Sequence, residues 1–249
     1  MFERGAPRRI TRPGDDSAAG VAHDGTMREA IGAILPLAVG VALSPVPIVA
    51  VVLMLATPIG RTNGIAFVAG WVVGLAVAGT IVLLVSGGAN ASDGGDPATW
   101  VSVVKLVLGL LLLALGVHSW RGRPRGDEVA ELPGWMKTID TFTAVKSLGL
   151  GVVASAINPK NLALVIAAAT AIAATGISGD DEAVAMAVFV VLATVGVGLP
   201  LALYLVMGAR SKPILDGLRE WMAHNNAAIM AVLILVFGFK FIGDGIAAL

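Results

Sequence analysis

The chain alternates between long apolar stretches and short polar connections. Each apolar stretch is close to the roughly 20 residues that a helix needs to span a bilayer. The six stretches cover about residues 30–56, 64–86, 99–118, 147–173, 183–207 and 227–247. This pattern predicts an all-α, polytopic membrane protein with six transmembrane helices.

The first 28 residues differ from the rest of the chain. They contain five arginines together with acids, Pro and Gly, and they show no apolar periodicity. We expect residues 1–28 to form a disordered N-terminal tail and residues 29–249 to form the transmembrane domain. Met27 lies at the boundary between the two, so translation from Met27 is an alternative to translation from Met1. The apolar run that follows is too long for the h-region of a cleaved signal peptide.

Composition agrees with a membrane location. Apolar residues make up 57% of the chain and charged residues only 14%, whereas soluble domains carry about 25% charged residues. The absence of cysteine excludes disulfides and Cys-based zinc sites. A formal net charge of zero gives no indication of a nucleic-acid partner.

The distribution of charge predicts a topology. The first, third and fifth connections contain basic residues, whereas the second and fourth contain acids and no Lys or Arg. The basic residues are Arg61, Arg121, Arg123, Arg125, Lys137, Arg210, Lys212 and Arg219. By the positive-inside rule the odd connections are cytoplasmic, which places both termini on the extracytoplasmic side of the plasma (inner) membrane. The arginine-rich tail conflicts with this orientation unless translation starts at Met27.

The two halves of the chain resemble each other weakly. A shift of 122 residues places Val73-Gly74 on Val195-Gly196, and a shift of about 111 places Ser44 on Ser155. Chance identity among Ala-, Val- and Gly-rich helices is the alternative explanation. Two repeats at about residues 29–120 and 146–249, with three helices each, would be inverted relative to one another. Inverted repeats are typical of secondary transporters, whose sites lie near the midplane at broken helices.

The first and fourth apolar stretches are each interrupted by proline. Proline has no amide hydrogen, so it leaves carbonyl groups that must be satisfied inside the protein or by a water-lined cavity. Two such breaks at matching places predict a substrate site at the midplane; a pair of packing kinks is the alternative. The candidate substrate-binding residues are Ser44, Pro45, Pro47, Ser155, Asn158, Pro159, Lys160 and Asn161.

Lys160 is the most informative of these residues. It lies about halfway along its stretch, where a charge costs at least about 2.5–3.5 kcal/mol. We expect it to face the protein interior or water, where two roles are open: it binds an anionic headgroup, or it titrates because burial lowers its pKa. In the alternative interpretation it is a structural lysine that donates to carbonyls freed by the opposite break.

Other polar positions are secondary candidates. Lys240 and Asp244 lie one turn apart and are expected to pair, and His118 occupies the place in the first repeat that Lys240 occupies in the second. Interfacial anchoring is the simpler role for His118. Lys105 is expected to extend outward to the membrane surface. Gly70 and Gly74 have the spacing of a small-residue helix contact.

Catalytic motifs are not found. The sequence contains no Gly-x-Ser-x-Gly elbow, no P-loop and no His-Glu-x-x-His. We therefore expect no enzymatic activity and no catalytic residue, cofactor or metal site. Any transport would be driven by a gradient or by partner proteins.

The combination of a Pro-x-Pro break in the first stretch with Asn-Pro-Lys in the fourth resembles the lysine-exporter (LysE/RhtB) superfamily. Within it the chain is similar to the GAP family, the peptidoglycolipid- and sulfolipid-addressing proteins of actinobacteria. The resemblance covers about residues 28–249 and rests on two segments, AILPLAVGVALSPVPIVAVVLMLATPIGRTNGIAFVAGWVVG and SAINPKNLALVIAAA. Val46 stands where the amino-acid exporters typically have glycine, and the cysteines of the thiol-transferring relatives are absent.

The resemblance implies a six-helix inverted-repeat membrane protein that moves cell-envelope lipids or glycolipids to the surface. Its motif positions are Ser44, Pro45 and Pro47 in the first break and Asn158 to Asn161 in the second. Membrane lipids would be partners, together with an envelope lipid synthase or exporter and, in a homo-oligomer, further copies of the chain. Two alternatives stay open: export of an amino-acid-like metabolite by proton antiport, and a non-transporting scaffold that docks partners through residues 121–140.

Overall fold

The computed structural model describes residues 15–92, 99–121 and 134–247. In this part of the chain every regular element is helical and no strand occurs, which confirms the all-α class. The α-helices are α1 (Asp15–Ala42), α2 (Pro45–Leu55), α3 (Gly60–Ser92), α4 (Thr99–Arg121), α5 (Ala144–Val152), α6 (Pro159–Ala174), α7 (Gly179–Met207) and α8 (Lys212–Ala247). Short turns of other types are η1 (Gly134–Thr141), η2 (Val153–Ile157) and η3 (Gly208–Ser211).

Two helix pairs are bent where the sequence predicts breaks. The first pair, α1 and α2, bends by 53°. Ser44 has the extended backbone of an N-cap residue, and Pro45 begins α2, where a missing amide hydrogen costs nothing. The second pair, formed by α5 with η2 and by α6, bends by 62°. There Asn158 caps α6 and Pro159 begins it, after the π-turn η2 has widened the end of α5.

Helices α3 and α7 pack against these breaks. A Cβ at Gly70 would collide with the carbonyl oxygen of Leu148, and a Cβ at Gly74 with Oγ of Ser155. The predicted small-residue contact at Gly70 and Gly74 is therefore present, between α3 and the broken pair α5–η2. Gly196 of α7 lies close to the end of α1, where an added Cβ would collide with the carbonyl oxygen of Ala42.

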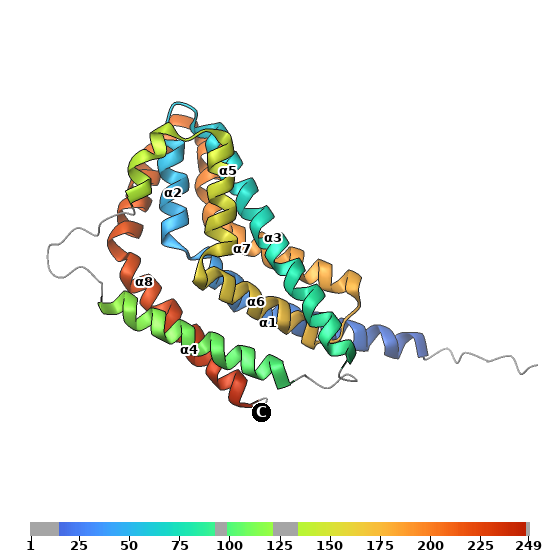
Figure 1. Cartoon of the computed structure of the whole chain (residues 1–249). Helices are drawn as coiled ribbons and strands as arrows, with labels where there is room; N and C mark the ends of the chain where they lie inside the picture. The colour runs from blue at the N-terminus through green and yellow to red at the C-terminus, as the bar shows by residue number, and fades with distance from the viewer. Residues whose placement is uncertain (1–14, 93–98, 122–133, 248–249) are drawn as a thin grey trace, which may run out of the picture.

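Helix α4 lies along the C-terminal half of α8 (Figure 1). Small residues bring the two backbones close together: a Cβ at Gly109 would lie 2.7 Å from a side-chain carbon of Ile242, and one at Gly238 would lie 2.7 Å from Leu113. In lipid, such van der Waals packing replaces the hydrophobic effect as a source of helix association. Between α7 and α8 the chain reverses through Gly208, whose φ of 55° favours glycine.

The surface of the bundle is apolar, as a lipid environment requires. Val206 is 85% exposed and Leu84 is 72% exposed. Two continuous helical stretches, Gly60–Ser86 and Gly179–Ala247, are long and apolar enough to cross a membrane, and the number rises to four if each bent pair is one span. The apolar part of α4, Lys105–His118, is shorter. The stretch that ends at Ala247 contains both the fifth and the sixth predicted spans, so the count of six stays a prediction.

Half of the expected disordered tail lies outside the described part of the chain. Residues 1–14 lie outside the described part of the chain, and α1 begins at Asp15, inside the segment that the sequence assigned to the tail. Most of the third predicted connection, residues 122–133, also lies outside the described part.

Candidate functional site

The break between α1 and α2 frees several carbonyl groups, among them those of Gly40 and Val41. In a continuous helix the carbonyl of Gly40 would accept from the amide of Ser44, and that of Val41 from the amide of residue 45. Ser44 has left the helical conformation and Pro45 has no amide hydrogen. Both carbonyls therefore need other donors, because they lie in a water-poor interior.

Lys160 supplies one of these donors from the opposite broken helix. Its Nζ donates to the carbonyl oxygen of Gly40 at 2.7 Å and to Oγ of Ser44 at 2.8 Å. Ser44 supplies the other, since its Oγ lies 2.6 Å from the carbonyl oxygen of Val41. The ammonium group is thus held by the first break although it belongs to the second.

Asn161 completes the connection between the breaks. Its Oδ1 lies 3.1 Å from Oγ of Ser44, and its Nδ2 donates to the carbonyl oxygen of Ala154 at 3.0 Å. That carbonyl is one that the second break frees. Ser44 has a single hydroxyl hydrogen, so it donates to either Val41 or Asn161 at any moment while it accepts from Lys160. The serine therefore has two alternative hydrogen-bonding states.

The network formed by Ser44, Lys160 and Asn161 is closed to solvent. Lys160 is 3% exposed, Ser44 2% and Asn161 0%. These three predicted site residues are brought together, and the carbonyl of Gly40 and the hydroxyl of Ser44 accept two of the three hydrogens of the ammonium group. The contact is the one that the structural interpretation of Lys160 predicts.

The remaining predicted residues surround this network without joining it. Asn158 accepts from the amide of Lys160 at 3.1 Å and so begins α6. Pro45 and Pro47 are buried at the start of α2, whereas Pro159 is exposed. Ser155 donates to the carbonyl of Val152 at 3.1 Å and packs against Gly74 of α3. These residues shape the two breaks, and none of their side chains forms a hydrogen bond with the ammonium group of Lys160.

The secondary candidates lie elsewhere. Lys240 and Asp244 form the expected ion pair one turn apart on α8, and His118 is exposed on α4. No group of three or more His, Asp or Glu side chains that could hold a metal ion occurs among the residues that the structure describes.

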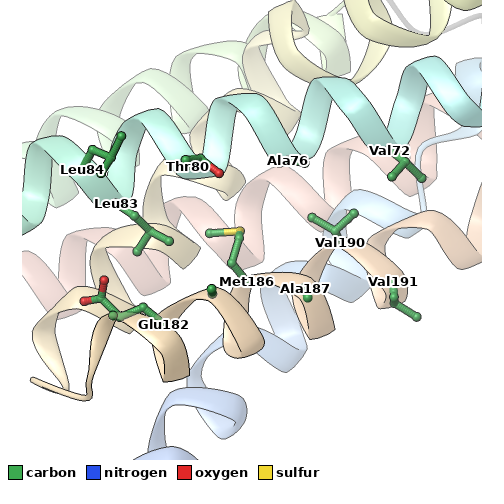
Figure 2. Close-up of a pocket in the computed structure, with 12 residues that line it drawn as sticks. Val72, Ala76, Thr80, Leu83, Leu84, Glu182, Met186, Ala187, Val190 and Val191 are labelled. Carbon is green, nitrogen blue, oxygen red and sulfur yellow. The ribbon is translucent and has the colours of Figure 1, made fainter.

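A groove of about 730 Å³ runs between α3 and α7. Its walls are almost entirely apolar, and Figure 2 shows Leu83 and Met186 extending into the space between the two helices. Thr80 and Glu182 add polar groups, and Glu182 lies at one end. The groove is open to the surface of the bundle, so it suits a hydrocarbon chain that enters sideways from lipid.

A smaller pocket of about 210 Å³ lies between α1, α4, α6 and α8. Its charged residues are Glu29, Lys105, Lys240 and Asp244. Lys105 was expected to extend outward to the membrane surface, and the sequence indicated no role for Glu29. The ion pair of Lys240 and Asp244 on α8, which the spacing predicted, forms part of one wall of this pocket. The other walls depend on which helices are neighbours, and that cannot be read from periodicity.

Comparison with known proteins gives one family. Residues 34–247 match the profile of the family described as Sap, sulfolipid-1-addressing protein. No curated protein and no solved structure matches the chain. The match confirms the sulfolipid-addressing part of the resemblance, whereas membership of the wider lysine-exporter superfamily stays a prediction.

Proposed function

The chain belongs to the sulfolipid-1-addressing protein family, and on that premise we propose that it exports a cell-envelope lipid or glycolipid across the plasma membrane. In this proposal the headgroup passes between the two proline-broken helices, and the protein catalyses no covalent step. The family assignment supports a lipid substrate. The positions of the two broken helices support the route of the headgroup.

The observation that carries the proposal is the polar link between the two breaks. Lys160 of one broken helix donates to the carbonyl of Gly40 in the other, and Ser44 and Asn161 extend the link. A buried charge inside a span is expensive, and it usually marks a substrate pathway. An anionic headgroup can replace the Gly40 carbonyl as the partner of Lys160, which would release the first break from the second.

The packing of α3 and α7 supports the inverted repeat that such a mechanism uses. Gly74 of α3 lies against the second break and Gly196 of α7 lies against the first. These are the glycines that the 122-residue shift superimposes. Each half therefore holds the broken helix of the other half, as two inverted three-helix units with six spans in total would do.

The groove between α3 and α7 supports a lipid substrate over a small metabolite. A lipid that moves its headgroup through the protein leaves its tails in the membrane, so the protein needs an opening toward lipid. The apolar walls of this groove and its position between two spans meet that need. An amino-acid-like substrate would have no use for such a groove.

The proposal is tested in a strain that lacks the protein. We expect the strain to make its envelope lipids in normal total amount, with one class missing from the surface-extractable fraction. Restoring the wild-type chain should return that class to the surface. The measurement compares surface and total lipid by thin-layer chromatography and mass spectrometry. Unchanged lipid fractions, combined with a changed sensitivity to amino acids or dipeptides, would favour the metabolite alternative.

The proposed orientation places both termini outside the cell and has its own test. The wild-type sequence contains no cysteine, so a single introduced thiol reports one position. Lys146 at the start of α5 and Asp180 at the start of α7 are both exposed. In intact cells a membrane-impermeant maleimide should label Asp180→Cys and leave Lys146→Cys unlabelled until the membrane is permeabilised. The opposite labelling pattern would reverse the topology.

A further inference from the structure

The small charged pocket continues toward the central network along three helices. On α1, Glu29, Ala33 and Leu37 line the pocket, and Gly40 follows on the same face at helical spacing. On α6, Ala174, Ala171 and Ala167 line it, and Lys160 lies two turns deeper, about 10 Å along the axis. The pocket and the network therefore lie at two depths of the same interface between α1 and α6.

One aromatic side chain separates these two levels. Phe241 of α8 lines the pocket, and its ring centroid lies 6.3 Å from that of Phe237, one turn deeper. The ring of Phe237 lies directly against Gly40, the residue whose carbonyl holds Lys160. Phe237 therefore lies between Phe241, which lines the pocket, and Gly40, which holds Lys160.

The charges of the pocket are only partly satisfied by one another. Lys240 is paired with Asp244, but that pair is about 40% exposed on both sides (42% and 38%), where such a pair contributes little to stability. Neither Lys105 nor Glu29 has an ion-pair partner among the residues that the structure describes. Lys105 is half-buried on an apolar helix.

We propose that this pocket is a second headgroup site, which binds the anionic, hydroxyl-bearing headgroup of a glycolipid. Lys105 and Lys240 bind the anionic group, with Lys240 leaving Asp244 to do so. Glu29 and the released carboxylate of Asp244 accept from sugar hydroxyls. A volume of about 210 Å³ holds a headgroup and leaves the tails outside. The inference rests on the proposed lipid-export function, and the predicted topology places the pocket at the extracytoplasmic end of the route.

The test is binding by the full-length protein in phosphatidylcholine nanodiscs. The probes are sulfatide, a 3-sulfogalactosyl lipid, and galactosylceramide, which lacks only the sulfate. We expect sulfatide to bind at least about tenfold more tightly. Lys105→Gln and Lys240→Gln should each weaken sulfatide binding by about tenfold, as the loss of one charge-assisted hydrogen bond implies. Glu29→Ala should also weaken it, since a carboxylate that merely repels anions would give the opposite sign.

Lys212 is the matched control for Lys240. It forms the same i, i+4 pair on the same helix, with Asp216 at 2.8 Å, but near the other end of α8. Lys212→Gln should leave sulfatide binding unchanged. Equal losses in the Lys212 and Lys240 variants would indicate general attraction of anionic lipid and would overturn the proposal. Soluble galactose 3-sulfate that binds as tightly as sulfatide would identify a water-soluble ligand and would overturn it as well.

Failure of this site can be told apart from failure of the proposed function. If sulfatide binds the wild type and only Lys160→Met removes the binding, the pocket is not the headgroup site but the central network stands. If the wild type does not prefer sulfatide to galactosylceramide, the anionic headgroup is wrong at both levels. Surface-lipid analysis of the deletion strain then decides independently whether the protein exports lipid.

Discussion

Under the proposed function, Lys160→Met is expected to lose most lipid export while the protein stays folded in the membrane. The variant loses the ammonium group that joins the two breaks through Gly40 and Ser44. Methionine keeps most of the apolar stem, so the space around it remains filled. Without the charge nothing on α6 can attract an anionic headgroup away from lipid at this level, and export should fall by at least about 100-fold, as the loss of one or two charge-assisted bonds implies.

Stability should change much less than export. Removing the ammonium group leaves the buried carbonyl of Gly40 without its donor, at a cost of about 1–3 kcal/mol. The same substitution removes the cost of keeping a charge inside a span, which is at least about 2.5 kcal/mol. The two effects oppose each other, so the melting temperature in detergent should move by only a few degrees.

The measurement is the surface fraction of the addressed lipid in the deletion strain carrying Lys160→Met. Lys146→Met is the matched control, because Lys146 is exposed at the start of α5 and belongs to no ion pair of the described residues. The Lys146→Met protein should export the lipid at the wild-type level. A Lys160→Met protein that is present at normal level and exports normally would show that the lysine is only a structural link, and the site would have to lie elsewhere.

The breaks could be located from the sequence because their cause is local. A proline within an apolar run interrupts the hydrogen-bonding pattern wherever it occurs, and Ser44 and Asn158 are good capping residues next to such prolines. The structure begins α2 at Pro45 and α6 at Pro159, as expected. The π-turn before Asn158 could not be located in this way. The residues from Val153 to Ile157 show no pattern that distinguishes a π-turn from an α-helix.

The partner of Lys160 could be predicted only as a class. A buried ammonium group needs acceptors, and freed carbonyls of the opposite break were the acceptors available in the alternative interpretation. That the carbonyl is the one of Gly40 depends on how α6 is rotated and shifted against α1. Periodicity in Ala-rich helices does not fix either quantity, since small residues occur on several faces.

The small charged pocket could not be predicted from the sequence for the same reason. Lys105 and Glu29 are far apart in sequence, and each is a common kind of residue near the end of a span, where long side chains usually extend to water. Only the packing of α4 on α8 and of α1 on α6 brings them to one cavity. Of the four charged residues of the pocket, only Lys240 and Asp244 were candidates from the sequence, because the charge pattern along a chain does not say which helix ends meet.

The contact between α7 and the first break predicts the largest loss of stability. Gly196→Ala adds a Cβ that collides with the carbonyl oxygen of Ala42, a backbone atom that cannot turn away. Overpacking of this kind typically costs about 1–3 kcal/mol. Gly217→Ala on α8 is the control, because a Cβ there meets nothing within 4 Å. Alanine in place of an exposed helical glycine should stabilise the protein by about 0.5–1 kcal/mol.

The difference between the two variants is measured by thermal unfolding in the same detergent. Gly196→Ala should melt several degrees below the wild type and Gly217→Ala at or above it. Gly74→Ala should behave like Gly196→Ala, since its Cβ would meet Oγ of Ser155 and the backbone of Val152 at the second break. Equal melting of Gly196→Ala and Gly217→Ala would mean that α7 does not hold the first break. In the proposed repeat Gly74 and Gly196 have equivalent roles. Each keeps a broken helix of the other half in the position from which Lys160 can reach Gly40.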